Sequence, residues 1–340
     1  MPALPRVSRE VRLAVVPDGL PRPEHFTVVE APLPAVEAGQ VLVRNRFFQV
    51  SARLRTLLAG EVKGAPLPPV RPGDSLPSAT VGEIVTAPDD SGLRPGDLVS
   101  HWQGWREYSV LPAAQCSPLG DALPDPVAHL GSGWPAYSAL TRYGRLQPGE
   151  TVLVTGGSGG VGSLAGQIAR KLGAARVIGS TGSPEKADRM ISELGYHAVL
   201  VLGAQDFATQ LAEAAPEGVD VVVDNVGGDQ LRAAVAAARR GARLTLVGAL
   251  SSQLSPHSAG TTTSVELDIY QFILKGISIY GCADLQDPAA RSAWTQQFGD
   301  WLRSGEITFP HVRVPGIENA AQALHEVING RHFGTVVVEL

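Results

Sequence analysis

One segment near the middle of the chain passes from an apolar strand pattern into a glycine-rich turn and then into a helical pattern. Residues 151–155 are mostly β-branched, a G-x-G-x-x-G spacing follows, and a helical pattern covers 163–172. Glycine at these positions permits a tight turn, a close backbone approach to a pyrophosphate and close helix packing, and the helix N-terminus offers N–H groups to phosphate. The segment therefore predicts a dinucleotide site. Its members are Gly157, Gly159, Gly160, Val161 and Gly162.

Composition and charge are those of an ordinary globular protein that acts on small molecules. The chain has 340 residues, 44% of them hydrophobic and 18% charged, with a net charge of -5. The longest basic cluster is Arg239-Arg240, so the charge pattern favours neither nucleic acid nor a membrane surface as a partner. No apolar run approaches the roughly 20 residues that span a bilayer. We expect a cytoplasmic protein.

Two patterns divide the chain into domains. From about residue 11 to 118, short alternating strands predict an antiparallel β unit. From about 133 to 281, strands alternate with helices, which predicts a doubly wound parallel sheet. The tail has two amphipathic helical patterns, near 294–303 and 317–329, and a terminal strand, and we expect it to complete the first unit. The predicted domains are thus 1–118 with 286–340, and 119–285.

The parallel sheet is predicted from five apolar strands with helices between them. One of these helices is expected over the alanine-rich residues 230–240. The expected strands are 151–155, 176–180, 219–224, 243–247 and 277–280.

Several short motifs along the chain identify a family. After the glycine turn come G-S-P-E-K at 182–186, D-N-V-G-G at 224–228, G-A-L-S at 248–251 and I-Y-Q at 269–271. In this order they resemble the medium-chain dehydrogenase/reductase superfamily, and within it the zinc-free leukotriene B4 dehydrogenase, or prostaglandin and alkenal double-bond reductase, family. The resemblance implies an α/β fold with a doubly wound Rossmann cofactor domain and a GroES-like antiparallel β substrate domain. It also implies a homodimer, which we expect to pair through the apolar edge strand at 276–281.

The chain departs from the family where the family touches its nicotinamide and substrate. Leu202 and Gln253 stand where the family has tyrosines, and His332 stands where it has an asparagine. The family's M-P-G-x-T-A-Y is here the segment 131–137, G-S-G-W-P-A-Y. These changes predict a pocket of a different shape, and so a substrate other than a prostaglandin.

The cofactor is expected to be NADPH. NAD enzymes of this fold carry an acidic residue about 20 residues past the glycine loop, to bind the ribose hydroxyl. Ser180 stands there instead, and together with Lys186 it predicts a contact to a 2′-phosphate. The resemblance places the remaining cofactor contacts at Asn225, Val247, Gly248, Ala249, Leu250, Ser251, Ile279 and His332.

The catalytic prediction starts from what the first domain lacks. Where zinc alcohol dehydrogenases carry a cysteine and a His-Glu pair, this chain reads Q-V-S-A-R at 49–53 and P-S-A-T at 77–80, so no metal site is expected. Alcohol oxidation needs a metal or base to acidify the hydroxyl, so reduction of a polarised C=C is favoured. The enolate oxygen would then need a donor. The candidates are Tyr270, Tyr280, Gln253, Tyr137 and the nicotinamide ribose hydroxyl.

The sequence therefore predicts an NADPH-dependent, zinc-independent reductase of α,β-unsaturated aldehydes or ketones. Two alternatives stay open. One is an NADPH-dependent quinone or carbonyl reductase. The other is a catalytically weak NADPH-binding protein that serves as a sensor or scaffold, because a fold does not fix a function.

Overall fold

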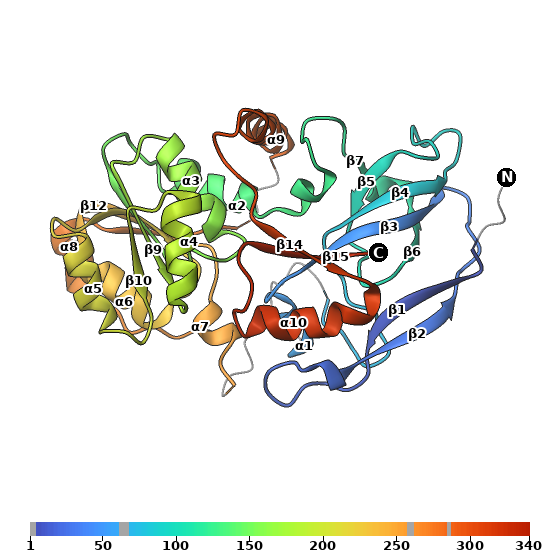
Figure 1. Ribbon diagram of the computed structural model, residues 1–340, viewed down its shortest axis with the longest axis horizontal. Coiled ribbons are helices and arrows are strands. Elements are labelled where there is room, and N and C mark those ends of the chain that lie inside the picture. Colours follow the sequence, from blue (N-terminus) through green and yellow to red (C-terminus); the bar gives the residue numbers. More distant parts are fainter. Residues whose placement is uncertain (1–4, 61–67, 257–261, 284–286) are drawn as a thin grey trace. The chain divides into compact units, whose positions relative to one another are not determined.

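The computed structural model describes residues 5–60, 68–256, 262–283 and 287–340 (Figure 1). The chain divides into two compact units. The first unit is Met1–Leu130 with His311–Leu340, and the second unit is Gly131–Pro310. No helix in the described ranges is both long and apolar enough to cross a bilayer.

The second unit is built on a six-stranded sheet in which every pair of neighbours is parallel. The chain starts at the centre with β8, moves outward through β9 and β10, and then crosses back to β11 on the other side of β8. This order confirms the predicted doubly wound sheet, whose topological switch point lies between β8 and β11. In spatial order the strands are β10 (Ala198–Val201), β9 (Arg176–Thr181), β8 (Thr151–Val154), β11 (Val219–Asp224), β12 (Ala238–Leu246) and β13 (Ser278–Gly281).

Helices pack in layers against this sheet. One layer holds α3, which contacts both α2 and α4, and another holds α5 in contact with α6. The buried core between strands and helices includes Leu153, Ile178, Val222 and Leu244. The helices are α2 (Gly133–Ser138), which continues as a π-helical turn at Ala139–Tyr143, α3 (Gly162–Lys171), α4 (Pro184–Leu194), α5 (Phe207–Ala214), α6 (Gly228–Ala236), α7 (Leu250–Gln253), α8 (Ile269–Lys275) and α9 (Pro288–Arg303).

Two expectations about this unit need correction. The helix expected over 230–240 ends at Ala236, because Ala238 already pairs with Val219 in the sheet and residues 238–240 belong to β12. Helix α9 was expected to belong with the first unit. It packs within the second unit, where the Trp294 ring stacks on Tyr137 with 4.8 Å between ring centroids. The contacts therefore divide the chain at 130/131 and 310/311 rather than at the expected 118/119 and 285/286.

The first unit is a mostly antiparallel β structure. The terminal strand β15 pairs antiparallel with β3, with Val336 opposite Val50, and thus returns the tail to the N-terminal strands. A separate two-stranded ribbon joins β1 (Val7–Leu13) to β2 (Phe26–Pro32). The larger sheet runs β14 (His311–Pro315), β15 (Thr335–Glu339), β3 (Gln40–Val50), β4 (Thr80–Thr86), β5 (Leu98–His101) and β7 (Ser117–Pro118), with β6 (Tyr108–Pro112) also on β3. Its helices are α1 (Leu54–Leu58) and α10 (Ala320–Ile328), and 3₁₀ turns lie at Pro23–His25, Ala113–Gln115, Pro126–Leu130 and Ile317–Asn319.

Candidate functional site

The glycine loop joins β8 to α3 at the carboxyl edge of the parallel sheet. Gly156 has φ +62°, so the left-handed residue of this turn is Gly156, which directly precedes the predicted site residues. At Gly162 a Cβ would overlap the Gly156 carbonyl oxygen and lie 2.5 Å from the Gly157 Cα, so only glycine closes the turn. At Gly159 the nearest atom would be 3.5 Å away. Gly159 therefore leaves its outer side open to a ligand. Gly160 and Val161 are half-buried in the same loop.

Tyr196 supports this loop from inside the fold, and sequence reasoning missed it. The ring is 2% exposed, and its hydroxyl donates to the Gly162 carbonyl oxygen at 2.7 Å. Its ring requires glycine at two places, because a Cβ at Gly166 or Gly179 would collide with it. A Cβ at Gly157 would collide with Met190 Cε and lie 3.2 Å from the Tyr196 hydroxyl. The glycines at 157, 166 and 179 were the one sign in the sequence that a bulky side chain packs there. The tyrosine that fills the space lies too far along the chain for a local motif to identify it.

Ser180 holds the glycine loop and does not face a ligand. Its side chain is fully buried, its hydroxyl accepts from the Gly156 N–H at 3.0 Å and donates to Gln230 Oε1 at 2.7 Å, and its carbonyl accepts from the Gly157 N–H at 2.8 Å. The predicted phosphate contact of Ser180 is therefore corrected to a positioning role. NADPH is still expected over NADH, because no carboxylate at the end of β9 would repel a 2′-phosphate.

A cation and two hydroxyl groups lie where β9 meets α4. The Ser158 hydroxyl of the glycine loop is 3.0 Å from the Thr181 hydroxyl at the end of β9. Ser183 caps α4 by accepting from the Lys186 N–H at 3.4 Å, so Lys186 sits in the first turn of an 11-residue helix. Lys186 is half-buried, and burial lowers the pKa of its ammonium group. The positive end of the α4 dipole and the Lys186 charge together suit a phosphate.

Asp224 joins the glycine loop to the loop after β11. Its carboxylate is fully buried, accepts from the Thr155 hydroxyl at 2.6 Å, and accepts from the N–H groups of Val226 and Gly227 at 3.0–3.2 Å. Burial raises the pKa of Asp224 above its ordinary range, although these bonds oppose the shift. Asn225, 6% exposed, donates from Nδ2 to the Thr155 carbonyl at 2.7 Å. Thr155 and Asp224 are thus further positioning residues that sequence reasoning did not assign.

The segment after β12 is held against the same loop. The N–H groups of Val247 and Gly248 donate to the Asp224 carbonyl at 2.8 and 3.2 Å, and the Leu250 N–H donates to the Asn225 carbonyl at 3.1 Å. Gly248 lies so close that a Cβ would be 2.7 Å from the Asn225 carbonyl oxygen. Ala249 and Ser251 belong to the same segment, where Ala249 caps α7. The structure therefore brings Asn225 and residues 247–251 together at the carboxyl ends of β11 and β12.

Tyr137, one of the four candidate side chains for the donor, stacks on Trp294. The other three lie in different surroundings. Tyr270 is 64% exposed on α8. The Tyr280 hydroxyl accepts from the Arg145 guanidinium at 3.1 Å, so it is already engaged. Gln253 is the last residue of α7 and is partly buried. Of the three, only Gln253 lies on the helix that directly continues residues 247–251.

Two further predicted cofactor contacts belong to other elements. Ile279 is 40% exposed on the edge strand β13, opposite Leu244. His332 belongs to the first unit, and its Nε2 lies 3.0 Å from a carboxylate oxygen of Glu326.

The two segments that replace the zinc ligands lie side by side in the first unit. The Gln49 N–H donates to the Ala79 carbonyl at 2.8 Å, and Ser51 and Ser78 stand near this contact in sequence. Across the described ranges, no three His, Cys, Asp or Glu side chains gather in a way that could hold a metal ion.

Comparison with known proteins identifies the family. Residues 9–119 match the family model "N-terminal domain of oxidoreductase", and residues 160–301 match "Zinc-binding dehydrogenase". The chain is 31% identical over 338 residues to the NADPH-dependent curcumin reductase of Escherichia coli, with 98% of this chain and 97% of the relative covered. The chain belongs to the medium-chain dehydrogenase/reductase superfamily, in its zinc-free alkenal and prostaglandin reductase group.

Other proteins are similar to the chain at slightly lower sequence identity. The 2-alkenal reductase (NADP(+)-dependent) of Nicotiana tabacum is 27% identical, with 88% of this chain and 87% of that protein covered. The crystal structure of CurA from Vibrio vulnificus superposes with a TM-score of 0.87 at 27% identity, covering 98% of both chains. A second structure of that CurA, solved in complex with NADPH, also gives 0.87, at 28% identity, covering 97% of this chain and 98% of that one.

Proposed function

We propose that this protein is an NADPH-dependent reductase of activated carbon–carbon double bonds in α,β-unsaturated aldehydes or ketones, and that it needs no zinc. The observation that carries the proposal is the glycine loop, open at Gly159 and fixed by Ser180, with Lys186 in the first turn of α4. The names of the similar curcumin and 2-alkenal reductases support the substrate class.

The residues of the second unit fit the proposed cofactor. The N-terminus of α3 and the open side of Gly159 suit the pyrophosphate, and Lys186 suits the 2′-phosphate. Asn225 and the segment 247–251 form the adjoining wall. Bound NADPH would supply a hydride to the β-carbon of the substrate, and a proton taken from water would complete the reduction at the α-carbon. The chain's own part is to hold the reactants and to stabilise the enolate oxygen, for which Gln253 is our candidate donor.

A substrate panel tests the proposal. NADPH consumption is measured with enals, enones, quinones and saturated aldehydes, each with and without a metal chelator. We expect enals and enones to be reduced at rates that chelation does not change. Fast reduction of quinones alone, or of saturated aldehydes alone, would favour the carbonyl or quinone alternative, and no consumption with any compound would favour a sensor or scaffold.

Lys186 is expected to select NADPH over NADH. Replacing Lys186 with alanine removes a charge-assisted contact to the 2′-phosphate, so NADPH binding should weaken by roughly 1–3 kcal/mol while NADH binding changes little. Calorimetric titration of both cofactors measures the difference. Lys171→Ala, which removes a surface lysine paired with Glu306, is the matched control and should change neither affinity. Equal weakening of both cofactors in Lys186→Ala would refute this role.

We also propose that two copies pair through the edge strand β13. Among the residues that the structure describes, β12 is the one strand that pairs with β13, and apolar side chains lie exposed on β13 and on α8. These are Ile269, Tyr270, Ile273, Leu274 and Ile279. Light scattering should give twice the 35.6 kDa mass of the chain. Ile279→Lys should give the single mass, because an edge lysine opposes strand pairing, whereas Ile191→Lys on exposed α4 should remain dimeric. A monomeric wild-type protein at micromolar concentration would exclude the dimer.

A further inference from the structure

One polar side chain lies on the buried face of helix α6. Gln230, in the first turn of this helix, is 7% exposed, and the other side chains that the helix buries are all apolar. Burial of an amide costs free energy unless the amide forms hydrogen bonds. The Ser180 hydroxyl donates to Gln230 Oε1 at 2.7 Å. This hydrogen bond connects α6 to the end of β9.

The hydroxyl of Ser180 links this amide to the glycine loop. A serine hydroxyl carries a single hydrogen, which Ser180 gives to Gln230. Its oxygen accepts from the Gly156 N–H at 3.0 Å. Because Ser180 is fully buried, loss of the Gln230 acceptor would leave the hydroxyl hydrogen without water as a substitute partner. We therefore expect the bond between Ser180 and Gly156 to depend on Gln230.

Gly156 in turn determines the shape of the rest of the loop. It has a left-handed φ of +62°, and its carbonyl accepts from the Gly159 N–H at 3.1 Å. The Gly159 carbonyl accepts from the Ser163 N–H in the first turn of α3, at 2.8 Å. A change in the backbone of Gly156 would therefore move Gly159 and the N-terminus of α3, which are expected to receive the pyrophosphate.

The helix that carries Gln230 is itself attached to the loop after β11. Gly227 is the N-cap of α6, and its N–H donates to the Asp224 carboxylate at 3.0 Å. The Ser251 N–H donates to the Val226 carbonyl of the same loop at 2.9 Å. Gln230 follows three residues after this N-cap. Hydrogen bonds therefore join the glycine loop, through α6, to the segment after β12.

We propose that Gln230 is a positioning residue for NADPH. Acting through Ser180, it holds the glycine loop in the conformation that receives the pyrophosphate of the cofactor. The inference rests on the NADPH binding of the proposed function and not on its substrate class. A loop that is held before the cofactor arrives binds it with a smaller loss of conformational entropy. Removal of the Gln230 amide should therefore weaken every ligand that carries the pyrophosphate and spare a ligand that lacks it.

Three ligands test this distinction by calorimetry. NADPH and NADH share the pyrophosphate, whereas adenosine 2′-monophosphate carries the 2′-phosphate without it. Gln230→Met keeps a similar volume and removes the amide oxygen. We expect the dissociation constants of NADPH and NADH each to rise about fivefold to tenfold, and that of adenosine 2′-monophosphate to stay at the wild-type value. Equal weakening of all three ligands, or no weakening of NADPH, would overturn the role of Gln230.

Ser180→Ala tests whether Gln230 acts through Ser180. This substitution alone should weaken NADPH, because the hydroxyl that holds Gly156 is gone. Adding Gln230→Met to Ser180→Ala should then raise the dissociation constant of NADPH by less than about twofold, since the linking hydroxyl is already absent. Additive effects of the two substitutions, or wild-type affinity in Ser180→Ala, would reject this route.

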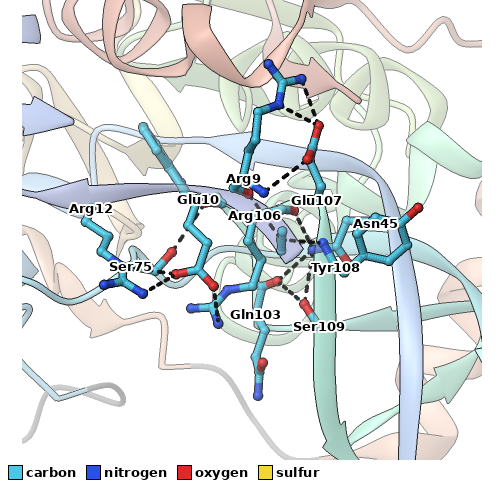
Figure 2. Close-up of polar contacts among 12 residues, drawn as sticks. Arg9, Glu10, Arg12, Asn45, Ser75, Gln103, Arg106, Glu107, Tyr108 and Ser109 are labelled. Atoms are coloured by element: carbon cyan, nitrogen blue, oxygen red, sulfur yellow. Dashed lines mark hydrogen bonds and ion pairs between the residues drawn. The ribbon is translucent and has the colours of Figure 1, made fainter. Parts of the chain in front are cut away.

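Two amides in other parts of the fold are matched controls. Gln210 of α5 pairs through both amide atoms with the backbone of Val201, at 2.9 and 3.0 Å. Figure 2 shows Asn45 of the first unit, where Nδ2 donates to the carbonyls of Gln103 and Arg106 at 3.0 and 2.8 Å. Gln210→Met and Asn45→Leu should lower stability and leave the affinities for all three ligands unchanged. A loss of NADPH affinity in both controls as large as in Gln230→Met would reject a specific role for Gln230.

The same measurements distinguish failure of this inference from failure of the proposed function. A wild-type protein that binds NADPH but reduces no enone would contradict the proposed reaction, and the comparison of the three ligands would still decide the role of Gln230. A wild-type protein that binds no NADPH would overturn both.

Discussion

Replacing Gly162 with alanine should abolish measurable NADPH binding and destabilise the second unit. The new Cβ would overlap the Gly156 carbonyl oxygen and crowd the Gly157 Cα, and these are backbone atoms that cannot rotate away. Overpacking of this kind costs about 1–3 kcal/mol, and here the relief would move the loop that is expected to hold the pyrophosphate. Thermal unfolding and cofactor titration of the same sample measure the two effects.

Gly159→Ala is the matched control. A Cβ at Gly159 would meet only the Gly156 carbonyl oxygen at 3.5 Å, an ordinary contact, so the free energy of unfolding should change little. NADPH binding should still weaken, because the methyl group would stand where the phosphate approaches. A Gly162→Ala protein with wild-type stability and affinity would contradict the assigned loop geometry.

The second large effect is expected at Asp224. Asp224→Ala should lower the free energy of unfolding by on the order of 3 kcal/mol or more, because the Thr155 hydroxyl and the Gly227 N–H would be left buried without their acceptor. The same change removes the hydrogen bonds through which Asp224 connects the loop after β11 to the glycine loop. We therefore expect weaker NADPH binding as well, measured on protein that is still folded at low temperature.

Asp224→Asn separates the charge from the hydrogen bonds. Burial raises the pKa of Asp224 above the ordinary 3.8, so between 3.8 and that raised value the native protein binds more protons at this group than the unfolded chain does. The contribution of Asp224 to stability thus falls as the pH rises through this window, and Asp224→Asn should lack that fall. Asp229→Ala, an exposed aspartate on α6, should change stability little. Equal stability of Asp224→Ala and Asp229→Ala would show that the buried hydrogen bonds of Asp224 do not stabilise the fold.

The sequence predicted those features that are local along the chain. The glycine loop and the alternation of strands and helices follow from short patterns, and the structure has both. The tail was expected to complete the first unit, and β15 does so by pairing with β3. Gly162 was assigned correctly to close packing because helix and strand are consecutive there.

Features that depend on residues distant in sequence were missed. Ser180 stands at the end of a strand, where a side chain can face a ligand, but Gln230 and the Gly156 N–H occupy its hydroxyl. Tyr196 fills space beside glycines from three elements. The apolar face of α9 shows that the helix packs on a core, but does not show which one, and Trp294 packs on Tyr137.

The most direct measurement of the central claim follows the hydride itself. The protein is incubated with an α,β-unsaturated aldehyde and NADPH that carries deuterium at C4, on each face in turn, and the product is analysed by mass spectrometry and NMR. The proposed function predicts the saturated aldehyde with deuterium on the β-carbon, from one of the two labelled cofactors. An allylic alcohol with deuterium on the carbinol carbon, or no labelled product from either cofactor, would contradict it.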